Sequence, residues 1–199
     1  LPRGYISSAR RSIPVEAMKR LRDAQLDGKN RRYAFARDMF LLSFYLRGIP
    51  FIDLAYLRKC DLKEDMLTYR RRKTGKQAHV QVEPCAMEII RHYAAKDRTT
   101  GYLLPIIRKT GEPEEERKQY DSALRLYNKH LKVLADVLGL KVKLTSYVAR
   151  HTWATTAHDI GVDIADISEA LCHSSEKMTK NYIRSFTGKS SLRCPLSST

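Results

Sequence analysis

The sequence has few cysteines and no long apolar segment. Its four cysteines, Cys60, Cys85, Cys172 and Cys194, form no C-x-x-C pair. This spacing argues against both a disulfide framework and a zinc site, so we expect reduced thiols. No run of about 18 or more apolar residues occurs, and residues 1–4 lack the apolar stretch of a signal peptide. We therefore expect a soluble, cytoplasmic protein.

Several common catalytic motifs are also missing. Thr74-Gly75-Lys76 is not part of a P-loop, because the required upstream glycine would fall at Arg70. There is no H-E-x-x-H motif, and paired carboxylates of the two-metal nuclease type are not evident. We therefore expect no nucleotide, no metal and no other cofactor. An enzyme of this kind that acts on phosphodiesters would need a metal-free mechanism.

Acidic residues are scarce relative to basic ones. The 199 residues include 37 Lys and Arg against 22 Asp and Glu, which gives a formal net charge of +15. Such a surplus favours a polyanionic partner, since basic side chains gain by displacing counterions from nucleic-acid phosphates. Acidic lipid headgroups are the alternative, but no basic amphipathic helix stands apart from the core pattern.

The apolar pattern indicates one mostly helical domain. With 43% hydrophobic residues, a chain of this length can form one packed core. Helical spacing predicts helices over residues 15–21, 35–46, 51–57, 84–94, 124–138, 147–160 and 164–171, and a last short helix that carries Tyr182. Two β-prone runs, 66–69 and 79–82, flank a hairpin connection at 73–76, and 99–118 is expected to be a polar connection. The predicted fold class is α+β, mostly helical, with a small antiparallel β-sheet.

A metal-free reaction on a phosphodiester needs three kinds of group. A side-chain oxygen must attack phosphorus, cationic groups must hold the non-bridging oxygens, and an acid must protonate the leaving oxygen. Tyr147 and Arg150 lie at i and i+3 on a predicted helix, so they can converge on one phosphate. His173 lies at a helix end, and Tyr182 follows nine positions later (182 − 173), about two turns into the last helix.

The C-terminal third carries these residues in an ordered set of motifs. Residues 144–155 read L-T-S-Y-V-A-R-H-T-W-A-T, followed by G-V-D at 161–163, L-C-H-S at 171–174, and Tyr182. This order resembles the signature of the tyrosine recombinases, the phage-integrase family, whose members typically read H-x-L-R-H-T-x-A-T, G-V-D, L-G-H-S and a tyrosine nine residues after that histidine. The resemblance covers roughly residues 13–186. The wording is especially similar to integrases of Bacteroides mobile elements.

The resemblance implies an enzyme that cuts and rejoins DNA. Tyr182 would be the nucleophile, forming a 3′-phosphotyrosyl link and releasing a 5′-hydroxyl. Arg150 would clamp the scissile phosphate, and His173 would hydrogen-bond it and help to manage the proton of the nucleophile. Lys73 matches the β-turn lysine of the family, the acid for the 5′ leaving oxygen. Because the covalent link conserves the phosphodiester energy, rejoining would need no ATP.

The chain departs from the family pattern at two positions. The first clamp arginine usually lies in a G-x-R-x-x-E-L segment, whereas residues 48–54 read G-I-P-F-I-D-L and place Pro50 there. Tyr147 stands where the family usually has histidine. Its hydroxyl can donate to a phosphate oxygen but cannot supply a positive charge near pH 7, and the ring could also be merely packed. Asp53 occupies the acidic position of the family and is expected to orient Arg150.

Arg71 is the expected substitute for the missing arginine. It lies two residues before Lys73, and residues i and i+2 of a strand project from the same face, so both side chains could reach one site. Arg70 and Arg72 would point the other way, towards solvent or DNA backbone. Arg47 is the second choice. Alternatively, Arg71 only contacts the DNA backbone together with its basic neighbours.

The resemblance also predicts the organisation of the protein. We expect a catalytic domain over residues 1–186, beginning with a basic arm at 1–12, and a flexible tail at 187–199. Family members add an N-terminal core-binding domain that this chain does not include, so we expect a fragment of an enzyme that acts as a homotetramer on two sites in double-stranded DNA. Two alternatives stay open: a DNA-binding relative that has lost catalysis, and a type IB topoisomerase, which shares the chemistry but relaxes supercoils without sequence preference.

Overall fold

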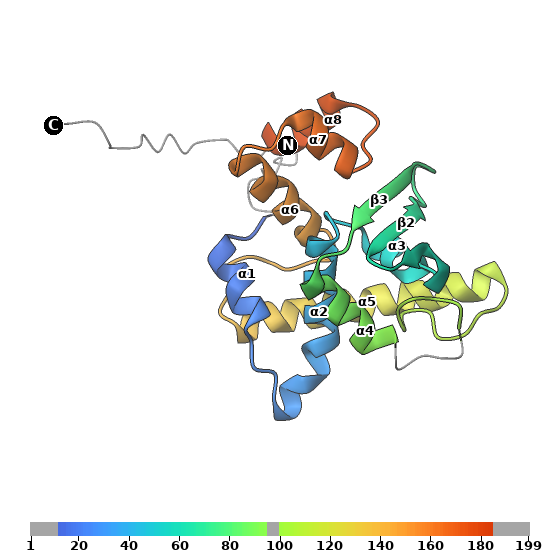
Figure 1. The fold of residues 1–199 in the computed structure, drawn as a ribbon. Coiled ribbons are helices and arrows are strands. Elements are labelled where there is room, and N and C mark those ends of the chain that lie inside the picture. The colour runs from blue at the N-terminus through green and yellow to red at the C-terminus, as the bar shows by residue number, and fades with distance from the viewer. Residues whose placement is uncertain (1–11, 95–99, 185–199) are drawn as a thin grey trace, which may run out of the picture.

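The computed structural model describes residues 12–94 and 100–184 (Figure 1). The arm predicted at 1–12, apart from Ser12, and the tail predicted at 187–199 lie outside the described residues. The α-helices are α1 (Val15–Arg22), α2 (Ala34–Tyr45), α3 (Phe51–Tyr56), α4 (Pro84–Ala94), α5 (Pro113–Val137), α6 (Val148–Asp159), α7 (Ile164–Ala170) and α8 (Glu176–Arg184). The other elements are the 3-10 helices η2 (Gly28–Tyr33) and η3 (Lys59–Asp61) and the strands β1 (Leu62–Lys63), β2 (Met66–Arg70) and β3 (Gln77–Gln81). The predicted fold class is therefore confirmed.

Helix α2 lies at the centre of the fold. It packs against α1, α3, α4, α5 and α6. Its completely buried apolar side chains are Ala36, Met39, Phe40 and Leu42. After α2 ends, Arg47 and Gly48 both adopt positive φ, so the chain turns sharply before it enters α3. This turn brings the segment around Gly48 against α6, where the candidate site begins.

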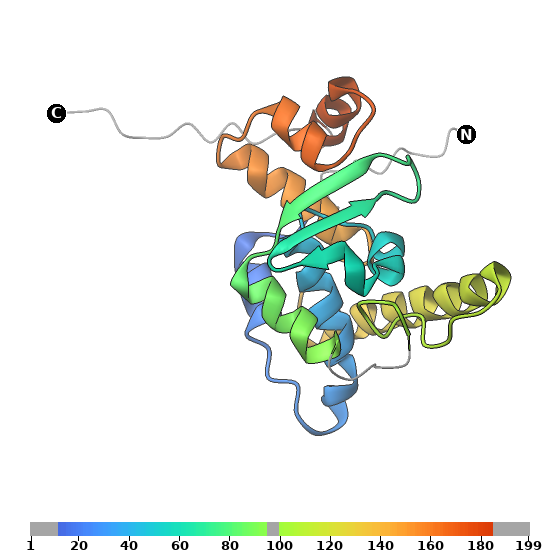
Figure 2. The ribbon, with the colours of Figure 1, turned by 45° about the vertical axis from the view of Figure 1, so that its right-hand side comes forward.

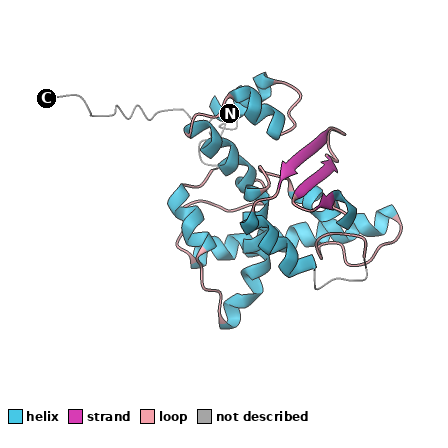
Figure 3. Ribbon diagram, viewed as in Figure 1, coloured by secondary structure: helices cyan, strands magenta, loops and turns pink. Residues whose placement is uncertain are grey.

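The three strands form an antiparallel sheet in the order β1-β2-β3 (Figure 3). Leu67 pairs with Val80 and Tyr69 with Ala78, and all four side chains are buried. The residues between them are exposed or half-buried, as the period-two alternation of a strand predicts. One face of the sheet therefore packs on the core. The turn of the β2–β3 hairpin, residues 71–76, contacts the C-terminal helices.

Buried apolar residues form two clusters. The larger, which we call the main core, joins α1 to α5, the sheet and the first turn of α6. The smaller, which we call the C-terminal cluster, lies between α6, α7 and α8, the orange to red end of the molecule in Figures 1 and 2. Its buried members are Ala154, Ala157, Ile167, Leu171 and Ile183. Helix α6 thus belongs to both clusters, one at each end.

The prediction that residues 99–118 form a polar connection is wrong in two respects. The middle of this segment is apolar and buried, with Leu104 and Ile107 completely inaccessible, and an isolated bridge joins Arg58 to Tyr102. Its charged end forms the first turns of α5, which begins at Pro113. Proline suits the first position of a helix because it needs no N–H bond there, and the glutamates that follow interact favourably with the helix dipole. The sequence analysis also missed β1, which has two residues.

The described cysteines are free thiols. Cys60 and Cys85 are exposed and Cys172 is buried, while Cys194 lies outside the described residues. Helix α5, with 25 residues, is long enough to cross a bilayer but carries many charges. Between residues 12 and 184, leaving out 95–99, no helix combines the length and the apolar character of a membrane span.

Candidate active site

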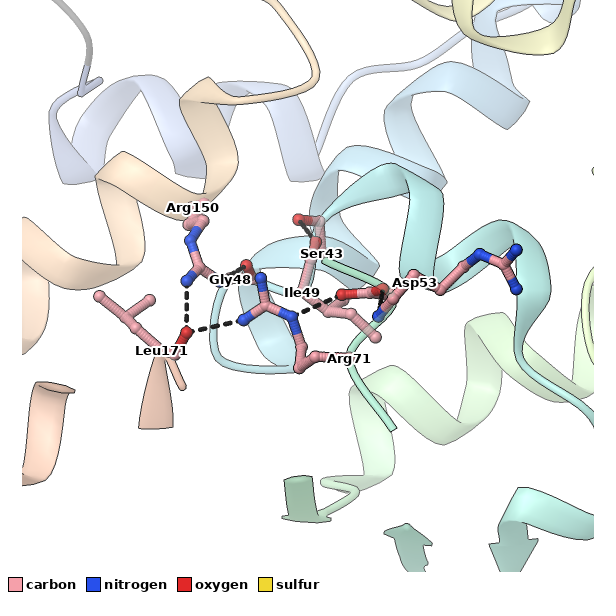
Figure 4. A network of polar contacts seen from close by, with 8 residues as sticks. Ser43, Gly48, Ile49, Asp53, Arg71, Arg150 and Leu171 are labelled. Carbon is pink, nitrogen blue, oxygen red and sulfur yellow. Dashed lines mark hydrogen bonds and ion pairs between the residues drawn. The ribbon is translucent and has the colours of Figure 1, made fainter. Parts of the chain in front are cut away.

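Arg150 is buried in the first turn of α6. Only 3% of the residue is exposed to solvent. Its Nη1 donates a hydrogen bond to the carbonyl oxygen of Gly48 at 2.8 Å, and its Nη2 donates to the carbonyl oxygen of Leu171 at 2.5 Å (Figure 4). Gly48 has φ +71°, and a Cβ added there would lie 2.9 Å from the Cα of Arg150. Only glycine therefore fits this close approach.

Arg71 reaches the same carbonyl oxygen from the hairpin. It is 6% exposed, its Nε forms an ion pair with Asp53 Oδ2 at 2.6 Å, and its Nη1 donates to the carbonyl oxygen of Leu171 at 2.7 Å. Figure 4 shows the guanidinium groups of Arg71 and Arg150 both directed at that oxygen. Two cations from segments far apart in the sequence thus converge on the end of α7.

The reason that the sequence analysis gave for the position of Arg71 is wrong. Strand β2 ends at Arg70, so Arg71 and Lys73 do not lie on one strand face; Arg71 points inward from the turn and Lys73 is exposed. Arg70 and Arg72 are both exposed, as predicted. The guanidinium of Arg72 stacks 3.7 Å from the ring centroid of Tyr56.

Asp53 has a different partner from the predicted one. Its carboxylate pairs with Arg71, and its other oxygen accepts the backbone N–H of Arg72 at 2.9 Å. Its described connection to Arg150 therefore runs through Arg71 and the carbonyl group of Leu171. A buried carboxylate needs such an ion pair and hydrogen bond, because an unpaired charge in the interior is costly.

His173 follows α7, and hydrogen bonds hold both its ring and its backbone. Its Nδ1 lies 2.8 Å from Thr179 Oγ1, and its carbonyl oxygen accepts a hydrogen bond from Lys76 Nζ at 2.6 Å. Burial, and then the positive charges of Arg150, Arg71, Lys76 and Lys73, lower the pKa of His173 to about 4. The ring is therefore neutral at pH 7, with one protonated nitrogen.

Lys73 and Tyr147 lie at the surface near these groups. Lys73 is exposed in the hairpin turn, close enough for its charge to affect the pKa of His173. Tyr147 is the N-cap residue of α6 and is 49% exposed, with its ring centroid 5.4 Å from that of His151. Tyr147 thus lies outside the group of buried polar contacts that Arg150 makes, although the two residues are about one helical turn apart. Arg47, the second choice for the missing arginine, is exposed at the end of α2.

Tyr182 lies on α8, nine residues after His173 and three after Thr179. Helix α8 packs against α6 and α7, where Ile183 and Thr179 are buried. The fold therefore brings the helix that bears Tyr182 next to the segment that holds His173 and Leu171.

Three contact groups were missed by the sequence analysis. Lys76 had a weak signal, because it belongs to the same K-T-G-K turn as Lys73. The carbonyl group of Leu171 had none, since every residue has a carbonyl group. Thr179 also had none, because threonine on a short helix is usually a surface residue. In the two described segments, no group of three or more His, Cys, Asp or Glu side chains is arranged to hold a metal ion.

The chain is similar to known proteins in sequence and in fold. The family described as "Phage integrase family" matches residues 15–189. The tyrosine recombinase XerA of Thermococcus onnurineus is 30% identical over 151 residues, which cover 74% of this chain and 50% of that protein. The chain therefore spans about half the length of this curated relative.

Solved structures share the fold at lower sequence identity. The crystal structure of XerA recombinase has a TM-score of 0.63 and 20% identity, and the match covers 92% of this chain and 61% of that one. XerH site-specific recombinase bound to a palindromic difH substrate, a post-cleavage complex, has a TM-score of 0.65 and 14% identity over 87% of this chain and 49% of that one. A lambda integrase dimer bound to a COC′ core site has a TM-score of 0.62 and 12% identity over 98% of this chain and 65% of that one.

Proposed function

The chain belongs to the phage integrase family, and on that premise we propose that it forms the catalytic domain of a site-specific tyrosine recombinase. The protein binds double-stranded DNA, cuts one strand at a time and rejoins it to a new partner. The net charge of +15 supports this activity, because a polyanion is the partner expected for such a surplus. The relatives solved in complex with DNA support the same substrate class.

The proposed reaction is a transfer of a phosphodiester bond to Tyr182 and back. The Tyr182 oxygen attacks phosphorus and gives its proton to solvent water, a bond forms between that oxygen and the 3′-phosphate, and the bond to the 5′ oxygen breaks. Lys73 gives a proton to the 5′ oxygen, which leaves as a hydroxyl. A 5′-hydroxyl from the recombining strand then attacks the phosphotyrosine and gives its proton to Lys73, and the released tyrosine oxygen takes a proton from solvent water. No bond energy is lost between the two steps, so the reaction needs no nucleotide.

The observation that carries the proposal is the convergence of two guanidinium groups beside a neutral histidine. Arg71 and Arg150 both donate to the carbonyl oxygen of Leu171, two residues before His173. Charge grows on the non-bridging oxygens during attack at phosphorus, and prepositioned cations stabilise it without reorganisation. Arg71 uses Nε for its ion pair with Asp53 and Nη1 for its hydrogen bond to the carbonyl oxygen of Leu171. Its Nη2 takes part in neither of these two contacts.

We infer that Arg71 replaces the clamp arginine whose position Pro50 occupies. Its burial and its ion pair with Asp53 support a fixed role better than the alternative of a loose contact with DNA backbone. Arg70 and Arg72 are exposed and remain the candidates for backbone contacts. Tyr147, at the surface, contributes at most one hydrogen bond to the phosphate.

The same proposal includes the extent of the domain, the oligomeric state and the kind of genetic element in which the protein acts. Residues 1–186 form the catalytic domain, and the full protein acts as a homotetramer on two DNA sites. The motif wording favours a role in a mobile element of the Bacteroides type.

A nicked suicide substrate tests the function. The full-length protein that contains this chain is incubated with a duplex carrying its own crossover site, nicked so that the cleaved strand diffuses away. We expect a covalent protein–DNA adduct that is absent for Tyr182→Phe and retained for Tyr45→Phe, a half-buried tyrosine on α2. A wild-type protein that forms no adduct on its own site contradicts the proposal.

Pro50 and Tyr147 favour one other function, a relative that binds DNA but has lost catalysis. In that case the wild-type protein shifts the duplex in a binding assay without forming the adduct. A type IB topoisomerase forms the adduct but also relaxes supercoiled plasmids that lack the crossover site. Plasmid relaxation therefore separates the topoisomerase from the recombinase.

A further inference from the structure

Thr179 is a buried polar residue that the proposed chemistry does not use. It is 0% exposed, although it lies on the short helix α8. Its Oγ1 is 2.8 Å from Nδ1 of His173, at hydrogen-bond distance. Tyr182 lies three residues further along the same helix, which is about one helical turn. A hydrogen bond therefore connects the helix of the proposed nucleophile to the ring of the histidine.

The protonation of His173 determines what this contact can do. Burial, and then the cations Arg150 on α6 and Arg71, Lys76 and Lys73 of the hairpin turn, lower the pKa of the ring, so it is uncharged at pH 7. A neutral imidazole has one nitrogen that donates and one that accepts, and the partner of one nitrogen decides the state of the other. Nδ1 faces Thr179, so a ring contact to a phosphate oxygen falls to Nε2.

We propose that Thr179 is a positioning residue that donates its hydroxyl proton to Nδ1 of His173, and so fixes the ring with its proton on Nε2, ready to donate to the phosphate. This inference rests on the proposed function. It also couples two parts of the site, because the bond between Thr179 and Nδ1 forms only when α8 is seated against α7. Ile183 and Thr179 anchor α8 there, the first by apolar contact and the second through the histidine.

The first test measures the ring nitrogens directly and needs no DNA. The 199-residue chain is labelled with nitrogen-15 in its histidines, and the Nδ1 and Nε2 shifts of His173 are recorded near pH 7. We expect a protonated Nε2 and an unprotonated, hydrogen-bonded Nδ1. A wild-type ring protonated on Nδ1 overturns the proposal without any variant.

Two substitutions separate the hydroxyl from the space that it fills. Thr179→Val keeps the branched shape and removes the hydroxyl, so both ring nitrogen shifts of His173 should change. Thr179→Ser keeps the hydroxyl and should retain the wild-type shifts. The matched control is Thr155→Val on α6, because Thr155 has a buried hydroxyl without a hydrogen-bond partner and its removal should leave His173 unchanged. Wild-type shifts in Thr179→Val contradict the proposal.

The second test follows cleavage in a single turnover of the suicide substrate by the full-length protein. Thr179→Val should cleave about 10- to 100-fold more slowly, by analogy with the loss when the partner that orients a metal-ligating histidine is removed. Thr179→Ser should recover most of the rate, and the affinity for DNA should stay the same in both. Equal losses in the two variants indicate packing alone and overturn the proposal. If the wild-type protein does not cleave, the proposed function fails while the ring shifts still test Thr179.

Discussion

The main core and the C-terminal cluster differ in size, and polar contacts join the C-terminal helices to the rest of the molecule. The main core is a continuous apolar cluster over α1 to α5 and the sheet, whereas the C-terminal cluster is small. Within residues 12–94 and 100–184, four hydrogen bonds reinforce the join between the C-terminal helices and the rest, and we call them the seam. They are the bonds Arg150–Gly48, Arg71–Leu171 and Lys76–His173, and the bond from the backbone N–H of Ile13 to Thr152 Oγ1.

This difference indicates which residues affect both the stability of the fold and the proposed cleavage reaction. Apolar contacts are non-directional, whereas a buried hydrogen bond or ion pair leaves an unsatisfied group when one partner is lost. Three of the four seam contacts involve residues proposed for chemistry or their immediate neighbours. We therefore expect substitutions at the seam to change cleavage and stability together, and substitutions in the main core to change stability alone.

The largest effect is expected at Arg71. Arg71→Ala leaves the carboxylate of Asp53 buried and unpaired, so the free energy of unfolding should fall by about 3–5 kcal/mol and cleavage should be lost. Adding Asp53→Asn should restore part of the stability but no cleavage. Chemical denaturation and the suicide substrate measure the two quantities.

Two controls frame this prediction. Arg72→Ala, at an exposed neighbour stacked on Tyr56, should cost less than about 1 kcal/mol. Leu104→Ala, in the main core, should cost about 2–5 kcal/mol and leave cleavage intact below its melting temperature. An Arg71→Ala protein that cleaves at the wild-type rate would refute the role of Arg71.

The next effect is expected at Gly48, where the seam is tightest. Gly48→Ala combines a left-handed backbone with a methyl group 2.9 Å from the Cα of Arg150, so it should lower the free energy of unfolding by about 2–4 kcal/mol. Gly75→Ala is the matched control, because Gly75 has nearly the same φ, +69°, and nothing within 4 Å of an added Cβ. It should cost about 1 kcal/mol from backbone strain alone. Equal losses in the two variants would mean that the contact with Arg150 does not matter.

The pH dependence of stability provides a smaller effect. Because the pKa of His173 is lowered to about 4 in the folded state from an ordinary value near 6.5, the unfolded chain binds more protons between these values. The free energy of unfolding should therefore fall as the pH drops from 6.5 to 4, and stay constant above 6.5 as far as this group is concerned. The ring is partly solvated, so we expect about 1–2 kcal/mol rather than the full linkage value.

A comparison with His173→Gln isolates this contribution from those of other groups. Glutamine does not titrate, so the wild-type protein should lose more stability than the variant over the same pH range. Parallel curves for the two proteins would show that the pKa of His173 is not lowered.

The smallest effect is expected at Cys172, where the family usually has glycine. Cys172 adopts φ +50°, a left-handed conformation that costs a residue with a Cβ about 1 kcal/mol. Cys172→Gly relieves the strain and loses the buried thiol, whereas Cys172→Ala loses the thiol and keeps the strain. Thermal denaturation should therefore rank glycine above alanine by about 1 kcal/mol. The reverse order would indicate that the turn before His173 is not strained.

Local pattern was enough for most of the fold. The spacing of apolar residues predicted α1 to α4, α6 and α7 to within a few residues, since each buries one face against its neighbours. It failed for 102–107, where buried apolar residues follow no helical or strand period. It also failed at the start of α5, where a charged run is solvated on a helix as easily as in a loop.

The candidate site was only partly accessible to sequence reasoning. Motif order singled out Arg150, His173 and Tyr182, and the structure brings Arg150 and His173 together with the helix of Tyr182. Arg71 was chosen for its position in a strand that does not extend so far. The partners of these residues, such as the Leu171 carbonyl group and Thr179, were not predicted.

The sequence by itself determined the order of the elements, the basic surplus and the motifs that mark the family, because these depend on composition and on spacing along the chain. Only the tertiary structure decided which of four consecutive basic residues, 70–73, turns inward. Arg71 is buried because Asp53, on a helix 18 residues earlier (71 − 53), and the carbonyl group of Leu171, 100 residues later, meet it there. An interior charge is stable only where such partners converge, and their convergence depends on how the sheet, α3 and the C-terminal helices pack together.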